Sequence, residues 1–308
     1  MSGKQRRKQR GAAVITALLI VALAATTASF MMWQNYLWLR QVENLDAQAQ
    51  ARWTARAAIN WGRAVLEEDK RDVDHNGEQW ATLLPPLAAE GGKVAGAIRD
   101  AQGLFNLNNL VRDGKVSQGD VVILTRLMIA LEIDPNLINA LLDWMDADSE
   151  VTYPGGAEDM QYLALDPPYR AANRALNDVD DLYRVQGFRQ EQIERLRPFV
   201  VALPLATTIN VNTAPAEVLV ALCAGLPLAE AKKLVELRTD GHFKDQADFR
   251  KNLAEGIQLR DEDYNVNSGF FIATARARQG RVQTGYQALL ERLAEGKTTI
   301  VWLKQIEE

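Results

Sequence analysis

Residues 10–33 read RGAAVITALLIVALAATTASFMMW, and they set the architecture of the whole chain. No residue from Ala12 to Leu39 is charged, whereas the ten residues before Gly11 carry five lysines and arginines. As a helix, the 22 residues from 12 to 33 would span about 33 Å, the thickness of a hydrocarbon core. The basic flank lies only on the amino-terminal side, which predicts one membrane crossing with a cytoplasmic N-terminus and the bulk of the chain outside the cytoplasm.

Three kinds of amino-terminal segment fit this pattern. A cleavable secretory signal would use Ala22-Leu23-Ala24 as its cleavage site, but cleavage there would leave an apolar N-terminus. An uncleaved signal anchor is the second alternative. The third is a short basic leader, residues 1–11, cut between Gly11 and Ala12 on the cytoplasmic face, which leaves the apolar helix on the mature protein.

Composition excludes several classes of protein. The 308 residues are 47% hydrophobic and 24% charged, which is typical of a folded chain rather than a disordered one. One cysteine and two histidines exclude a disulfide framework and a cysteine- or histidine-rich metal centre. The net charge of −5 becomes −10 once the basic leader is removed, so nucleic acid is not an expected partner.

Periodicity predicts a helix followed by an interrupted sheet. The first helix is expected to run to about Glu68, with residues 12–33 in the membrane and Ala51, Ala55 and Ile59 on its packed face. Residues 93–99, 270–276, 281–286 and 298–303 read as strands, and the pattern between about 117 and 254 is helical. We therefore expect an α+β fold with residues 34–112 and 263–308 in one body and residues 113–262 as an inserted α-domain.

The leader and helix resemble those of type IV pilin-like proteins. Such proteins have a long N-terminal helix packed on a small antiparallel sheet, and most carry Glu where this chain has Thr16. The missing Glu, the unusual length and the motifs at residues 73–80, 100–108, 143–150 and 300–303 are similar to the K-type minor pseudopilins of the type II secretion system, GspK. A neutral Thr16 fits a subunit at the filament tip, with none ahead of it, although Thr is also a tolerated helix residue.

The resemblance implies a function, partners and processing. A K-type protein caps the tip of the periplasmic pseudopilus, helps to start its assembly, and is a structural protein rather than an enzyme. Expected partners are the I- and J-type minor pseudopilins, through them the major pseudopilin, and the inner membrane. Prepilin peptidase would cut between Gly11 and Ala12, and the new N-terminus would be methylated.

One acidic segment in the predicted insert has the spacing of a calcium loop. Carboxylates at Asp146, Asp148 and Glu150 alternate, and a later acid could close a shell of oxygen ligands. The match to an EF-hand is imperfect, because no Gly stands at the sixth position. GspK-type proteins carry calcium in this domain, and the resemblance implies as ligands Asp143, Asp146, Asp148, Glu150, Glu158 and Asp159. The alternative is a solvated acidic helix end. A second acidic stretch, residues 72–77, lacks a closing carboxylate and reads as a turn after the long helix.

A rival function arises from residues 208–253. Ile209-Asn210-Val211-Asn212 and the segments after it resemble the helix-hairpin-helix repeats of membrane-anchored DNA receptors of the competence type. The expected Gly-hydrophobic-Gly turn is Gly225-Leu226-Pro227 here, so one backbone N–H that would face a phosphate is missing. With the acidic balance of the chain, this favours a packing module over a DNA-binding one. No set of side chains suited to catalysis is evident.

Overall fold

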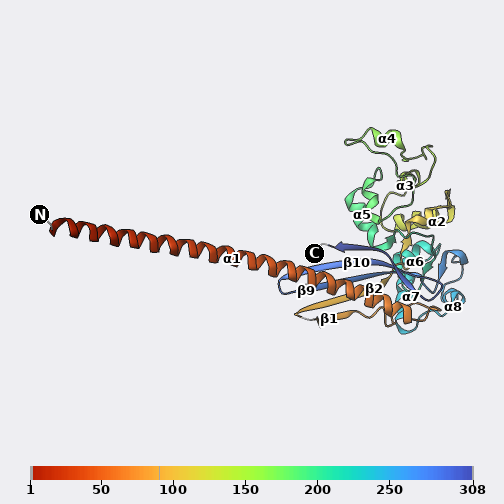
Figure 1. Ribbon diagram of the computed structural model, residues 1–308. Helices are drawn as coiled ribbons and strands as arrows, with labels where there is room; N and C mark the ends of the chain where they lie inside the picture. Colours follow the sequence, from red (N-terminus) through yellow and green to blue (C-terminus); the bar gives the residue numbers. More distant parts are fainter. Residues whose placement is uncertain (1–2, 90, 307–308) are drawn as a thin grey trace.

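The computed structural model describes residues 3–89 and 91–306. One helix, α1 (Gly3–Glu68), runs unbroken for 66 residues, or about 100 Å at 1.5 Å per residue. Figure 1 shows its first half standing clear of the rest of the protein and its last turns lying against a sheet. The prediction of a single helix ending near Glu68 is confirmed.

The free half of α1 is apolar and exposed. Within the helix from Ala12 onward lies a segment long and apolar enough to cross a membrane. Large apolar side chains on every side of it, including Ile15, Leu19 and Leu23, are more than 60% exposed. A helix that is apolar all round has no polar face to present to water, so its natural surroundings are lipid or the helices of other subunits.

The sheet has five antiparallel strands: β1 (Leu84–Ala89), β2 (Gly92–Asp100), β9 (Phe270–Gln279), β10 (Val282–Arg292) and β11 (Thr298–Ile306). Their order in space is β1-β2-β9-β10-β11. Four of them are the strands expected from the sequence, each longer than predicted. The edge strand β1 was not expected, because Pro85 and Pro86 argue against a strand; an edge position and a register shift accommodate them.

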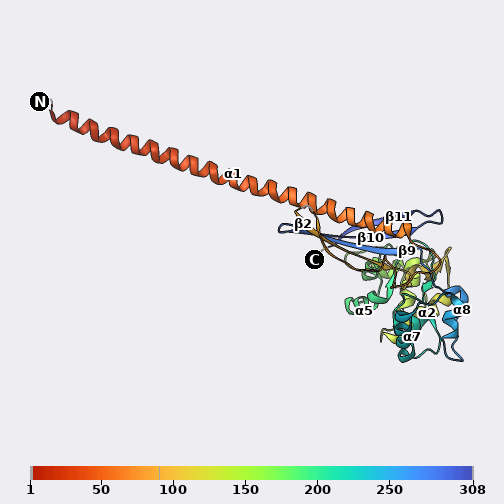
Figure 2. The same ribbon diagram turned by 90° about the horizontal axis from the view of Figure 1, so that it is seen from below.

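The last turns of α1 cover one face of this sheet, as Figure 2 shows. Small residues on both surfaces allow a close approach, because Ala51 and Ala55 of the helix and Ala273 of β9 are all buried in one cluster. At Gly62 even a methyl group would lie 3.1 Å from Ile98 of β2. The predicted packed face of the helix is therefore correct.

Helical elements fill the chain between β2 and β9. They are β3 (Phe105–Asn106), η1 (Leu107–Leu110), β4 (Val111–Arg112), β5 (Lys115–Val116), α2 (Gln118–Ala130), α3 (Leu137–Met145), α4 (Asp159–Leu163), η2 (Val179–Arg184), α5 (Gln190–Leu196), η3 (Arg197–Phe199), β6 (Val200–Val201), β7 (Ile209–Asn210), α6 (Ala216–Leu222), α7 (Leu228–Asp240), α8 (Gln246–Lys251), η4 (Asp261–Asp263) and β8 (Tyr264–Asn265). Because β2 and β9 are neighbours in the sheet, the helical domain is inserted between two adjacent strands.

The helical domain has its own hydrophobic core, separate from the one between α1 and the sheet. Two short parallel pairs, β3 with β6 and β7 with β8, tie its entry and exit segments together. A third, small cluster, which includes Ala101, Leu203 and Phe270, joins the domain to the far face of the sheet. The fold is α+β, as predicted.

Candidate metal site and the junction between the two domains

The acidic loop follows α3. That helix ends at Met145, and the backbone N–H of Asp146 donates to the Leu142 carbonyl at 2.9 Å. The chain then returns to start α4, with Glu158 as the residue before its first turn. Three of the predicted ligands meet here: single oxygens of Asp146, Asp148 and Glu158 all lie within 4.8 Å of one another. We call these three residues the carboxylate triad.

The carboxylate triad contains two buried oxygens without a partner. Oδ1 of Asp146 and Oε1 of Glu158 accept no hydrogen bond from the residues that the structure describes. Burial, and then the charges of Asp148 and Asp143, raises the pKa of Asp146 to about 6. Burial, and then Asp143, Asp146 and Asp148, raises the pKa of Glu158 to about 7. Uncompensated negative charge and unfilled acceptors are what a bound divalent cation would relieve.

Asp143 braces the loop from beneath. Its side chain is fully buried, and both carboxylate oxygens accept from the Thr152 backbone N–H, at 3.2 and 3.0 Å. The loop closes so tightly over it that a methyl group on Gly156 would lie 2.2 Å from Asp143 Oδ2 and 2.3 Å from the Thr152 carbonyl oxygen. Only glycine fits there, so the narrow loop is a constraint of the sequence as well as of the acids.

The remaining two predicted ligands lie outside the carboxylate triad. Glu150 is exposed, and its backbone N–H donates to Asp148 Oδ1 at 2.8 Å. Asp159 accepts from the Ala171 N–H at 3.1 Å and lies 3.4 Å from Arg170. Asp159 therefore already has a structural role, in holding the chain after α4.

The predicted processing and assembly residues lie on α1. Gly11 and Ala12 are inside the helix, and Thr16 follows one turn later. The Thr16 hydroxyl donates to the carbonyl oxygens of Ala12 and Ala13, at 3.1 and 3.0 Å. Its polar group is thereby satisfied within the helix, which lets it sit in an apolar environment without a partner subunit.

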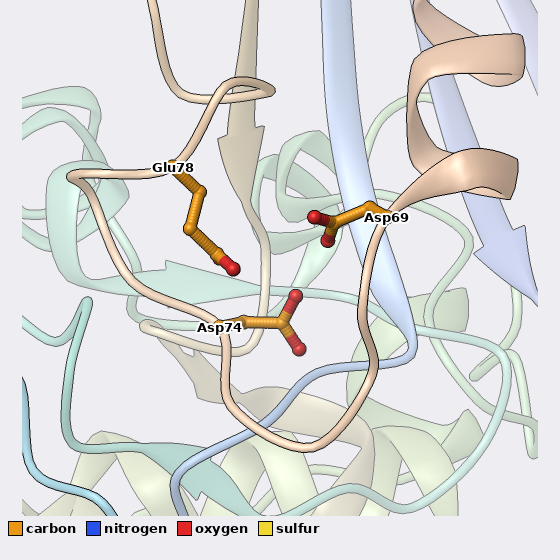
Figure 3. Close-up of side chains that lie close together, drawn as sticks. All are labelled: Asp69, Asp74 and Glu78. Carbon is orange, nitrogen blue, oxygen red and sulfur yellow. The ribbon is translucent and has the colours of Figure 1, made fainter.

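A second group of acids lies directly after α1. Figure 3 shows Asp69, Asp74 and Glu78 turned toward one another, and single oxygens of the three lie within 4.8 Å. Here, however, Arg292 supplies the countercharge: it pairs with Asp69 at 3.0 Å and with Asp74. Glu78 accepts from the Trp80 indole N–H at 2.7 Å. Protein donors thus do the work of a cation in this group, which agrees with the sequence-based interpretation of a turn.

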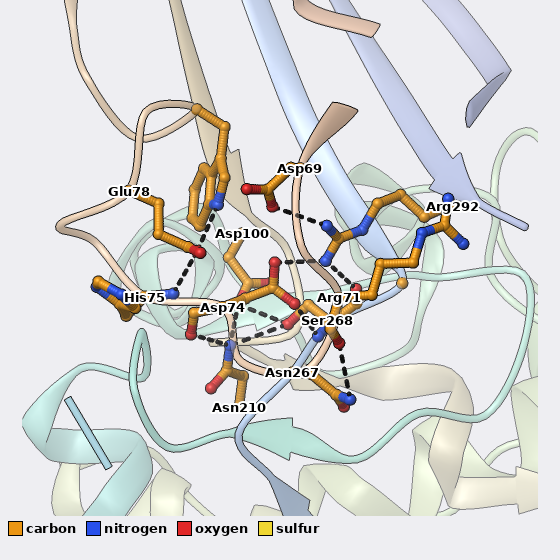
Figure 4. A network of polar contacts seen from close by, with 12 residues as sticks. Asp69, Arg71, Asp74, His75, Glu78, Asp100, Asn210, Asn267, Ser268 and Arg292 are labelled. Atoms are coloured by element: carbon orange, nitrogen blue, oxygen red, sulfur yellow. Dashed lines mark hydrogen bonds and ion pairs between the residues drawn. The ribbon is translucent and has the colours of Figure 1, made fainter. Parts of the chain in front are cut away.

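That turn belongs to a buried polar network between the two domains, which we call the junction network (Figure 4). Asp100, at the end of β2, accepts from Asn210 at 2.8 Å, Thr213 at 2.6 Å and Ser268 at 2.7 Å. Asn210 also donates to the Asp74 carbonyl at 3.0 Å. Residues from the turn, the sheet and the helical domain therefore share one set of hydrogen bonds.

Burial controls the charges in this network. It raises the pKa of Asp74 to about 7, although Arg292 opposes that rise, and it raises the pKa of Asp100 as well. A single buried arginine thus serves two buried carboxylates, and neutral hydroxyl and amide donors satisfy the rest. Sequence reasoning missed this network; the only signal was the run of asparagines at positions 106, 108, 210 and 212.

Those asparagines are structural brackets. Asn106 accepts from the Leu203 N–H at 3.0 Å, and Asn108 donates to the Leu176 and Leu203 carbonyls at 2.9 and 2.8 Å. Asn212 exchanges two hydrogen bonds with the backbone of Phe243, at 2.9 and 2.8 Å. Polar residues that suggested a DNA-binding repeat therefore hold loops of the helical domain in place.

The hairpin of the helix-hairpin-helix-like module is also occupied internally. Gly225 has φ +89°, and the Leu226 N–H donates to the Cys223 carbonyl at 3.0 Å. Leu226 itself is buried, and α7 begins directly after Pro227. A phosphate would find neither the free N–H groups nor the positive charge that it needs.

Comparison with known proteins agrees with this architecture. Two family models, both described as type II secretion system protein K, match residues 103–205 and 209–271. A relative of that name in Pseudomonas aeruginosa is 35% identical over 96% of this chain and 92% of its own length. Another, in Aeromonas hydrophila, is 31% identical over 96% of both chains.

A solved structure, that of the GspK-GspI-GspJ complex from the enterotoxigenic Escherichia coli type 2 secretion system, contains a chain with the same fold. The TM-score is 0.70 at 22% identity, over 87% of this chain and 100% of the other. The long identical stretches with the curated relatives extend from the apolar helix into the sheet and the inserted domain. This chain therefore belongs to the type II secretion system protein K family and is a minor pseudopilin of that system.

Proposed function

We propose that this pseudopilin caps the tip of the periplasmic pseudopilus and helps to start its assembly. The observation that carries the proposal is the placement of the helical domain between β2 and β9, at the end of a rod one helix wide (Figures 1 and 2). Subunits of a pilin-like filament pack their α1 helices side by side. A body so much wider than its rod fits at an end of such a filament, where no subunit must pass over it.

Thr16 supports an end position. An ionised carboxylate in the bilayer core costs about 3 kcal/mol unless it finds a partner. A subunit with none ahead of it has no such partner within reach, and the Thr16 hydroxyl is satisfied inside its own helix.

The capping proposal is tested by removing the domain. Ala101 donates its N–H to the Phe270 carbonyl at 3.0 Å, so the chain ends flanking the insert are already adjacent. A short Gly-Asn hairpin joining residues 101 and 269 would close β2 onto β9. We expect the shortened subunit, still bound to its partners, to enter the body of the filament. If it remained at the tip and filament length did not change, the capping proposal would be wrong.

We further propose that the subunit assembles with I- and J-type minor pseudopilins through α1. The solved relative is in a complex with GspI and GspJ. Beyond the membrane segment, α1 exposes Trp38, Leu45 and Trp53 at 66, 64 and 71%. These side chains are suited to helix packing against partner subunits.

That interface can be mapped by single cysteines. The one native cysteine, Cys223, is fully buried, and burial raises the pKa of its thiol to about 12, so it is unreactive. Leu45→Cys should form disulfides with cysteines placed on partner helices, whereas a cysteine at the exposed Lys232 of α7 should not. Equal cross-linking at both positions would contradict the proposal.

The proposed processing follows from the leader. Prepilin peptidase would cut between Gly11 and Ala12, the new N-terminus would be methylated, and α1 would anchor the mature protein by one pass through the inner membrane. The basic residues before Gly11 would lie in the cytoplasm and the sheet and helical domain in the periplasm. We expect no catalytic activity: the two histidines stack on each other at 4.0 Å, and the only thiol is buried.

Finally, we propose that the carboxylate triad binds calcium. The unpartnered oxygens of Asp146 and Glu158 and the tight loop at Gly156 support this. Asp146, Asp148 and Glu158 would supply carboxylate oxygens, while Asp143 holds the loop through Thr152. The ion would neutralise the charge of the triad and tie α3 to α4. Thermal unfolding with calcium or with chelator tests the site: binding to the folded state alone must raise the midpoint, and an unchanged midpoint would remove the claim.

A further inference from the structure

A cleft lies where the turn after α1 meets α7. Its volume is about 290 Å³, and its polar lining comes from both domains: His75 and Asn76 from the turn, and Arg238, Thr239 and His242 from α7 and the segment after it. None of these residues is part of the carboxylate triad. The proposed capping role does not use the cleft either.

Arg238 is a cation without a countercharge. Its Nη1 donates to the Val211 carbonyl at 2.7 Å, and within residues 3–89 and 91–306 no carboxylate pairs with it. Burial lowers the pKa of Arg238 to about 10, so it stays charged at neutral pH. The buried Arg292, in contrast, has Asp69 and Asp74 as partners. A guanidinium has five N–H donors, and most of those of Arg238 remain to be satisfied.

The two histidines add donors on the same cleft. The rings of His75 and His242 stack, with centroids 4.0 Å apart and an interplanar angle of 12°. Nδ1 of His75 accepts from the Gly77 N–H at 3.1 Å, which places the proton of the neutral ring on Nε2. The nearest acid, Glu78, is occupied by the His75 backbone N–H at 2.9 Å and by Trp80 (Figure 4).

A cleft with one unpaired arginine, two imidazoles and no carboxylate among its lining residues favours a negative ligand, even in a chain of net negative charge. We propose that it binds an oxyanion the size of a carboxylate or a phosphate group, with Arg238 as the main donor. An arginine is suited to such ligands because its planar fork donates two parallel hydrogen bonds. Since the lining comes from both domains, the bound anion would also bridge them.

The histidines themselves provide the assay. They are the only two in the sequence, and both line the cleft, so their ring ¹H–¹³C NMR signals report on it without background. The full, untagged chain in detergent would be titrated with inorganic phosphate and, separately, with N-acetylglutamate, against sodium chloride at equal ionic strength. We expect saturable shifts with at least one of the two anions, and the anion that binds identifies the source of the group.

Variants decide whether Arg238 is the donor. Arg238→Gln should weaken binding about tenfold or more, while Lys232→Gln, which removes one exposed positive charge from the same helix, should bind as the wild type does. Should Arg238→Gln fail to fold, Arg238→Lys keeps the charge without the fork and should bind more weakly than the wild type. Shifts no larger than those in chloride, or full binding by the Arg238 variants, would overturn the proposal.

Discussion

Calcium binding to the carboxylate triad should release protons, by an amount that depends on pH. Without calcium the pKa of Asp146 is about 6 and that of Glu158 about 7. At pH 6.5 these groups are about one-quarter and about three-quarters protonated, so together they hold about one proton. Calcium needs both carboxylates ionised, so about one proton must leave per ion bound at pH 6.5 and only about a tenth of a proton at pH 8.

The release can be measured by calorimetric titration in two buffers of different ionisation enthalpy. The difference in apparent binding enthalpy between the buffers gives the number of protons. Glu158→Gln, which cannot bind a proton at this pH, should reduce the release to about a quarter of a proton and weaken binding. Binding of calcium at pH 6.5 without proton release would refute the assignment of these two residues as ligands.

The same pKa values predict how stability changes with pH. The folded-state pKa of Asp146 and Glu158 lies above the ordinary value, so the folded protein binds more protons than the unfolded one between about pH 4 and about pH 7. Without calcium these two groups should therefore make the protein less stable as the pH rises through that window. Saturating calcium keeps both groups ionised in the folded state and should remove their contribution to this decline.

Three substitutions test the remaining structural assignments. Arg292→Met should lower the free energy of unfolding by about 3–5 kcal/mol, because it leaves the buried Asp74 unpaired; Asp74→Asn in the same chain should recover part of the loss in denaturant unfolding, and additive effects would contradict the pairing. Gly156→Ala should weaken calcium binding about tenfold, since its methyl group would lie 2.2 Å from Asp143 Oδ2, whereas Gly241→Ala, which meets nothing within 4 Å, should not. Thr16→Glu should impair secretion while Thr16→Ala does not, and equal secretion by both variants would remove the end-position argument.

Much of the fold follows from local patterns in the sequence. The apolar run after Gly11 predicts the first half of α1, and the alternation in residues 270–303 predicts the three C-terminal strands. β1 escaped because Pro85 and Pro86 are poor strand residues whose cost vanishes only at an edge. Knowing that an edge is available requires the finished sheet.

The candidate site was predictable only in part. The spacing of Asp146 and Asp148 indicates a loop of acids, but whether Glu150 or Glu158 turns inward depends on where α4 begins. The junction network could not be predicted at all, since Asp74 and Arg292 are 218 residues apart and neither is unusual in its local sequence. Tertiary packing alone decides which charges become buried together.

The most direct test of the account is the mass of the mature protein isolated from the inner membrane. A pseudopilin keeps its whole apolar helix, and α1 is continuous through residues 12–33. We predict a chain that begins at Ala12 with a methylated amino group. A chain that begins at Ala25, or one that keeps Met1, would contradict the assignment.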